Sequence, residues 1–130
     1  MDRRLWIIFV YGFFPLTICG CSGDANAPYI PASNTARKAL EISLKKWQSG
    51  DAHGPIETGK PAINVFDMRW QQGKKLESFE ILEELAEAHR TFSVKIKLAK
   101  QPEEMNKYLV VGIDPLLVFR DIDYQHATGQ

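Results

Sequence analysis

The sequence predicts an α+β domain in which one N-terminal helix is followed by about four or five antiparallel strands. Apolar side chains recur at helical spacing over residues 35–49. Apolar and charged side chains alternate over residues 91–99, as expected for an antiparallel strand with one buried face. Two further apolar runs, 108–113 and 116–119, are separated by an Asp-Pro pair, and this pattern predicts two strands joined by a tight turn.

The composition is that of one ordinary globular domain. The chain has 130 residues, of which 45% are hydrophobic and 25% are charged, so it can bury a core but is too short for two typical domains. The 16 basic and 16 acidic residues balance. Because they are interleaved and form no basic stripe, we expect no nucleic-acid partner. The two cysteines, Cys19 and Cys21, both lie near the N-terminus, so we expect no disulfide within the domain.

The first 20 residues have the composition of an export signal. Two arginines precede an uncharged, largely apolar run of 14 residues, 5–18, as in the n-region and h-region of a signal peptide. A helix of that length spans only about 21 Å, which is shorter than the roughly 30 Å hydrocarbon core of a bilayer, and Pro15 would interrupt it. We therefore expect residues 1–20 to be a signal peptide that is removed on export. A retained transmembrane helix is the alternative.

The run ends in Leu-Thr-Ile-Cys-Gly-Cys-Ser-Gly, residues 16–23, which resembles the lipobox of bacterial lipoproteins. Ile18 and Gly20 fit the positions that precede the lipidated Cys21, whereas Cys19 departs from the usual Ala, Ser or Thr. The resemblance implies a diacylglycerol thioether on Cys21 and a further acyl chain, such as palmitate, on the new amine. Two or more chains anchor a protein stably. A conventional secretory signal with incidental cysteines is the alternative.

The same resemblance implies a location. The protein would be exported and held by lipid at the cell-envelope face of a bacterial membrane. Ser22, directly after Cys21, resembles the corresponding residue of lipoproteins that are forwarded to the outer membrane.

Residues 21–33 are expected to form a lipidated, flexible tether, because they are rich in small residues and contain two prolines. The helix then begins at Ser33 or Asn34, since either side chain can serve as N-cap, and it ends at Gly50. Trp47 falls on the apolar face, where we expect it to anchor the core. Three segments connect the helix to the long strands: a loop at 50–61, a short strand at 63–66 and a turn at 67–73.

Residues 76–89 are ambiguous. Their composition favours a helix, whereas the apolar positions of 76–81 and the need for a partner beside strand 91–99 favour a strand. We favour a strand over about 75–84. The segment 102–106 is expected to be a loop tip between strands.

Three stretches of this pattern, ALEISLKKWQSGD, WQQGKKLESFEIL and YLVVGIDPLLVFRDIDY, resemble small uncharacterised bacterial envelope lipoproteins. The resemblance implies a cystatin-like domain over 34–124, of the type shared with nuclear transport factor 2 and ketosteroid isomerase, with a C-terminal tail at 125–130. In such folds a curved antiparallel sheet wraps the helix and leaves a cone-shaped pocket. Different members use the pocket for steroid-like substrates, peptides or subunit contacts, so the fold alone does not give the function.

One catalytic combination can be assembled from the sequence. An isomerase of this architecture needs a carboxylate base and an oxyanion donor in an apolar pocket. Asp67 would be the base, Tyr108 the donor and Trp70 part of the ligand pocket. The alternative is structural, because Asp67 follows a strand and Tyr108 begins one.

We expect neither a metal nor a cofactor. His53, His89 and His126 lie in separate segments without a neighbouring ligand residue. Asp121 and Asp123 supply too few oxygens for calcium and are expected at a solvated strand end. The sequence contains no glycine-rich phosphate loop and no nucleophile motif.

The expected function is that of a lipid-anchored, non-catalytic binding or protein-interaction module in the cell envelope. Its partners would be the membrane, through the lipid anchor, and a second copy of the chain or another envelope protein on an open face of the sheet. Two alternatives remain. One is a small isomerase or dehydratase on the same fold, and the other is a purely structural envelope protein.

Overall fold

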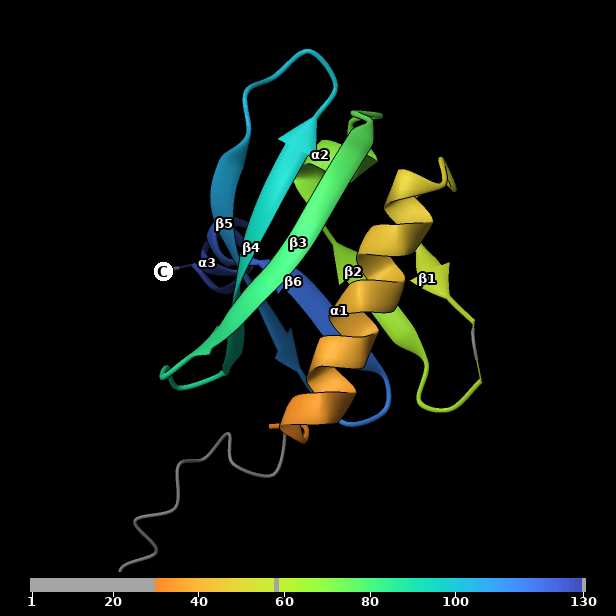
Figure 1. Ribbon diagram of the computed structural model, residues 1–130. Coiled ribbons are helices and arrows are strands. Elements are labelled where there is room, and N and C mark those ends of the chain that lie inside the picture. Colours follow the sequence, from red (N-terminus) through yellow and green to blue (C-terminus); the bar gives the residue numbers. More distant parts are fainter. Residues whose placement is uncertain (1–29, 58, 130) are drawn as a thin grey trace, which may run out of the picture.

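One long helix precedes six strands along the chain (Figure 1). The computed structural model describes residues 30–57 and 59–129, so Cys21 and the expected signal peptide lie outside the described residues. The elements are α1 (Ser33–Gln48), β1 (Pro55–Ile56), β2 (Ile63–Phe66), α2 (Met68–Gln71), β3 (Leu76–Leu85), β4 (Arg90–Leu98), β5 (Glu104–Val111), β6 (Leu116–Arg120) and α3 (Asp121–Thr128).

The six strands form one open sheet in the order β1-β2-β6-β5-β4-β3. Neighbouring strands are antiparallel except β2 and β6, which run parallel with Ile63 opposite Leu116. The α+β class is confirmed, but the expected number of four or five strands is wrong, because β1 has only two residues and so gives no alternating pattern. The parallel pair was also not expected. It arises because the chain leaves β2 through α2 and starts β3 at the opposite edge of the sheet.

The predicted N-terminal helix is confirmed as α1, which lies across one face of the sheet (Figure 1). Its start differs from the expectation, because Ala32 is the N-cap and makes no side-chain hydrogen bond. The Ser33 hydroxyl instead donates to Oε2 of Glu84 at 3.1 Å. At the other end Gly50 has a φ of 84°, a left-handed conformation that glycine adopts without strain, so the predicted stop is confirmed.

The core lies between α1 and the strand faces that point toward it. On β4 the inward side chains alternate with half-buried ones, which is the predicted pattern. Each large apolar side chain buried in this way stabilises the fold by about 1.5–3 kcal/mol. The most completely buried members of this cluster are Ala36, Leu40, Phe92, Val94, Ile96, Tyr108, Val110 and Val118.

The ambiguous segment 76–89 begins as strand β3 and is not a helix. It pairs with β4, with Phe79 opposite Ile96 and Ile81 opposite Val94, and both of these β3 side chains pack against the core. Packing against a neighbouring strand outweighs the helical propensity of the segment. The preferred strand at 75–84 is therefore confirmed.

Two features in the C-terminal half differ from the expectation. The expected loop tip at 102–106 overlaps β5, which begins at Glu104. The polar side chains at the start of that strand conceal any apolar alternation. Residues 121–128 form α3, so the expected end of the domain at 124 falls inside a helix. Among the described residues no helix is both long and apolar enough to span a bilayer.

Candidate functional site

Asp67 and Tyr108 are brought together although they lie on different elements. Asp67 is the last residue before α2 and caps that helix, since its Oδ1 accepts from the backbone N–H of Arg69 at 2.9 Å. The turn expected at 67–73 thus contains a short helix. Tyr108 lies on β5, and its hydroxyl donates to Oδ2 of Asp67. The sequence-based pairing of these two residues therefore corresponds to a direct contact.

Arg69 completes this buried cluster. Its Nη2 donates to the Tyr108 hydroxyl at 2.9 Å, and its Nε lies 3.4 Å from Oδ1 of Asp67. Its Nη1 donates outward to Glu104, whose side chain is half exposed. Burial opposes the charge of Arg69, but the neighbouring Tyr108 and Asp67 outweigh it and raise the pKa of the guanidinium. Arg69 was not among the residues singled out in the sequence.

The cluster is closed to solvent. Asp67 and Tyr108 are each only 1% exposed, and burial, followed by the charge of Asp67, raises the pKa of the Tyr108 phenol well above its ordinary value. A general base and an oxyanion donor act only where their polar atoms can reach a substrate. Here the carboxylate and the hydroxyl bond to each other, so the arrangement stabilises the junction of β2, α2 and β5.

Trp70, the third residue of the combination, points elsewhere. Its ring stacks on Trp47 with the ring centres 6.0 Å apart, and its Nε1 donates to the carbonyl of Asp51 at 2.8 Å. The His53 ring meets the indole of Trp70 nearly at right angles, at 5.3 Å. Trp47 in turn donates from Nε1 to the carbonyl of Lys74 at 2.7 Å, and its burial confirms the predicted core position.

These two tryptophans border a hollow of about 560 Å³, within the range of small-molecule sites. Figure 1 shows that α1 ends close to α2 and to the start of β3, and residues from these places line the hollow. Its lining comes from the end of α1, the loop after it, α2 and the residues before β3. The lining residues are Trp47, Gly50, Asp51, Ala52, His53, Trp70, Gln71, Gly73, Lys74 and Lys75.

Several polar groups of the hollow have no partner within the described part of the chain. His53 Nε2 is buried without a hydrogen-bond partner. Lys74 and Lys75 are exposed, and no described carboxylate lies within 4 Å of either ammonium. Asp51 is the one described acidic residue of the lining, and its carboxylate lies 3.6 Å from Lys46. Buried polar atoms in folded proteins usually have partners, and the His53 nitrogen is, with Asn106 Nδ2, one of two exceptions among the described side chains.

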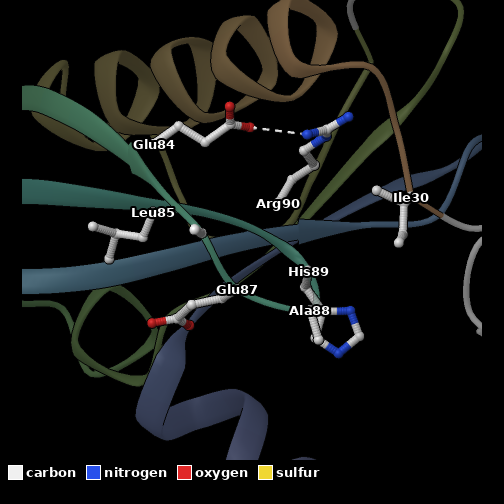
Figure 2. Close-up of a pocket in the computed structure, with 8 residues that line it drawn as sticks. Ile30, Glu84, Leu85, Glu87, Ala88, His89 and Arg90 are labelled. Carbon is white, nitrogen blue, oxygen red and sulfur yellow. Dashed lines mark hydrogen bonds and ion pairs between the residues drawn. The ribbon is translucent and has the colours of Figure 1, made fainter.

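A second hollow, of about 390 Å³, lies at the β3–β4 hairpin. Figure 2 shows the side chains of Glu84 and Arg90 facing each other across it, joined at 3.3 Å, with Ile30 beside them. Arg90 Nε also donates to the carbonyl of Pro31 at 2.8 Å. These groups are occupied in holding the start of the domain against the hairpin, so this hollow is the weaker candidate for a ligand.

The expected positions of the two C-terminal aspartates are corrected. Asp123 is not at a solvated strand end but is buried in the first turn of α3. Its carboxylate accepts from Arg120 at 3.1 and 3.2 Å and from the backbone N–H of Met68 at 3.2 Å. Within 30–57 and 59–129 no group of three or more His, Cys, Asp or Glu side chains is placed to hold a metal ion.

The hollow was only partly foreseen from the sequence. The sequence predicts Trp70 as part of a ligand pocket, but His53 has no neighbouring ligand residue along the chain, and no motif there marks Lys74 and Lys75. The run Trp70-Gln-Gln-Gly-Lys-Lys could have indicated the lysines of this hollow, because it places both of them directly after the turn that contains Trp70.

The fold and the site were compared with known proteins. No family model, curated protein or solved structure matches the chain. The function is therefore inferred from the residues of the hollow and from the sequence before the domain.

Proposed function

We propose that this protein is a lipid-anchored, exported binding module of the bacterial cell envelope, which holds a small ligand in the hollow beside Trp47 and Trp70. The anchor would be a lipidated Cys21 at the face of a membrane, in the outer membrane if Ser22 acts as a sorting residue. This part of the proposal rests on the apolar run and the lipobox-like residues 16–23.

The observation that carries the binding role is the hollow itself. It combines two aromatic side chains, a buried nitrogen without a partner at His53 and two lysines without a described acidic partner. Ligand sites typically have apolar walls with a few polar groups that fix orientation. The enzyme alternative is less well supported, because Asp67 and Tyr108 are buried and bonded to each other.

The geometry also suits a tethered receptor. The domain begins at Ser33, 12 residues after Cys21, and that length of chain reaches at most about 40 Å. The hollow lies at the other end of α1, a helix of 16 residues and so about 24 Å long. The domain would therefore present the hollow away from the lipid surface.

We further infer that the domain is of the cystatin-like type shared with nuclear transport factor 2 and ketosteroid isomerase. The inference is supported by one helix lying across the face of a largely antiparallel sheet. In such an architecture the hollow would be the opening of the pocket between the helix and the sheet. The side chains of Trp47, Trp70 and Tyr108 would fill the inner part of that pocket.

Tryptophan fluorescence tests the binding role directly. The chain has three tryptophans; Trp6 belongs to the expected signal, and both of the others line the hollow. The processed protein, extracted from membranes in a non-aromatic detergent, would be titrated with benzoate and with its neutral analogue benzamide. Binding of either probe at the hollow should change the emission of Trp47 and Trp70.

Two matched variants locate any binding. Ala52 is an exposed lining residue of this hollow, and Ala88 is an exposed lining residue of the hairpin hollow. Ala52→Phe should fill the site and abolish the response, whereas Ala88→Phe should leave it unchanged. If neither probe alters the emission, or if Ala52→Phe binds normally, the proposed site is wrong.

A second candidate function, self-association, is favoured by an exposed apolar surface on the other face of the sheet. Phe66 is 42% exposed and stacks on Phe119 at 4.7 Å, while Met68 and Ile122 are 46% and 47% exposed. Exposed apolar side chains grouped in this way are typical of protein contact surfaces. The occupant we propose is a second copy of the chain, with another envelope protein as the alternative partner.

Sedimentation equilibrium in detergent measures this directly. The wild-type protein should be dimeric and Phe66→Glu monomeric, because a buried charge opposes association. Leu82→Glu, which changes a side chain of similar exposure on β3 (39%), is the control and should remain dimeric. A monomeric wild type would refute self-association, and a protein with neither dimer nor ligand would support the purely structural alternative.

A further inference from the structure

The charges around the hollow are predominantly positive. Lys74 and Lys75 lie at its rim on the approach to β3, and Lys46 lies beside it at the end of α1. Lys46 is matched by Asp51, so the two lysines before β3 provide the excess charge. Behind the aromatic wall, the Arg69 guanidinium lies 5.7 Å from the centre of the Trp47 ring, but its donors are occupied by Asp67, Tyr108 and Glu104.

The charged side chains of the lining are the donors Lys74 and Lys75 and the acceptor Asp51, whose carboxylate already faces Lys46. Both indole N–H groups already donate to backbone carbonyls, so the tryptophans contribute apolar ring surface only. His53 Nε2 has no partner in the described chain. Lys74 and Lys75 can only donate. A bound molecule that supplies oxygen acceptors would pair with both lysines together.

We propose that the hollow binds a small molecule with a flat or apolar body and an acidic group, a carboxylate or a phosphate. The body would lie against the exposed edge of Trp70, and the acidic group would accept from Lys74 and Lys75. This inference rests on the proposed binding role of the same hollow and adds the chemical class of the ligand. Both lysines are exposed, so solvent screens their attraction and its contribution is modest.

The test compares probes that differ only in charge. Benzoate should bind at least about tenfold more tightly than benzamide, as measured by quenching of Trp47 and Trp70, and its affinity should fall as salt is raised. Phenyl phosphate and inorganic phosphate extend the comparison. Tighter binding of phenyl phosphate than of benzoate would assign a phosphate ligand, and the reverse order would assign a carboxylate. Inorganic phosphate lacks the apolar body and should bind more weakly than phenyl phosphate.

A pair of double variants tests the lysines. Lys74→Gln with Lys75→Gln should weaken benzoate binding by about tenfold and leave benzamide unchanged. Lys38→Gln with Lys60→Gln removes the same charge from exposed lysines remote from this hollow, and benzoate should still bind normally.

The outcomes separate the two proposals. Equal binding of benzoate and benzamide, abolished in both cases by Ala52→Phe, would overturn the anion inference and leave the binding role standing. An unchanged benzoate affinity in the Lys74/Lys75 double variant would also overturn the anion inference and leave the binding role standing. Failure of every probe to bind at the hollow would refute both.

Discussion

The hydroxyl of Tyr108 donates to the carboxylate of Asp67 across 41 residues of sequence, inside the core. The bond joins the middle of the sheet, at β5, to the point where the chain leaves β2 and enters α2. Arg69 contacts both partners, so three largely buried polar side chains satisfy one another. Buried polar groups arranged in this way are costly to disrupt singly.

Removal of the Tyr108 hydroxyl should destabilise the domain. Tyr108→Phe leaves Asp67 and Arg69 buried with one partner fewer, and we expect a loss of about 1–3 kcal/mol in the free energy of unfolding. Urea denaturation measures the loss. Tyr124→Phe, whose hydroxyl lies 3.3 Å from His89 in a more exposed position, is the control and should cost less. Equal losses in the two variants would show that the buried cluster contributes no special stability.

The same phenol predicts how stability depends on pH. Burial, with the charge of Asp67, raises the pKa of Tyr108 well above the ordinary 10.0, so the unfolded chain loses this proton near pH 10 while the folded chain keeps it. Above pH 10 the unfolded state therefore binds fewer protons, and the free energy of unfolding should fall by up to about 1.4 kcal/mol per pH unit. Below pH 10 the contribution of this group is constant.

Denaturation at pH 9, 10 and 11 checks the dependence. The wild-type protein should lose more stability over this range than Tyr108→Phe, which lacks the group. Parallel curves for the two proteins would rule out Tyr108 as the cause.

The ion pair of Asp67 and Arg69 should be strongly coupled. Asp67→Asn leaves a buried guanidinium without its one buried countercharge, with only the half-exposed Glu104 remaining, and should cost about 3 kcal/mol. Arg69→Met leaves the carboxylate in a similar position, and the double variant should lose much less than the sum of the two single losses. The exposed pair of Glu41 and Lys45, 2.8 Å apart, is the comparison and should show almost no coupling. Additive losses at Asp67 and Arg69 would contradict the contact.

Gly112 is expected to tolerate no side chain. Its φ is 88°, and a Cβ there would lie 2.7 Å from the carbonyl oxygen of Pro115. Gly112→Ala should therefore lose at least about 2 kcal/mol of stability from combined backbone strain and contact. Gly73→Ala separates the two causes, because Gly73 has a φ of 82° but open space around it, and it should lose about 1 kcal/mol. Similar losses would mean that Pro115 moves aside.

The proposed lipid anchor depends on one specific cysteine. Cys21→Ser should abolish lipidation, so the protein should no longer carry the mass of diacylglycerol and acyl chains and should leave the membrane fraction if its signal is still cleaved. Cys19→Ser is the matched control and should be lipidated and processed normally. Intact mass spectrometry of protein extracted from its own host decides between them. A Cys21→Ser protein that is processed and still held in the membrane would show that the anchor is not this lipid.

The fold was predictable where one periodicity dominates. Helix α1 and strand β4 each bury one face, and their apolar residues repeat at 3.6 and 2 residues respectively. The residues of β3 alone could not decide between helix and strand. Its pairing with β4 stabilises the strand, and that pairing depends on residues distant in the sequence. Helix α3 was missed for a similar reason, since its first turn is held by contacts from Arg120 and Met68 to Asp123 that no local pattern contains.

The candidate site was also predictable only in part from the sequence. Asp67 and Tyr108 were paired on chemical grounds and do touch, but sequence reasoning could not show that Arg69 and burial would close the pair off. Trp70 was assigned to a pocket and lines one. The place of His53 beside it depends on the path of the loop after α1, which composition does not determine.

Arg90 bonds to the carbonyl of Pro31, and Glu84 accepts from Ser33, so the first residues of the domain are fastened to the β3–β4 hairpin as well as to α1. This arrangement has a mechanical consequence for a tethered protein. A pull on the tether would be shared between the helix and two strands of the sheet, and it would not unwind α1 from its first turn. The end of the helix beside the proposed ligand hollow would then keep its shape while the end nearer the proposed anchor bears the load.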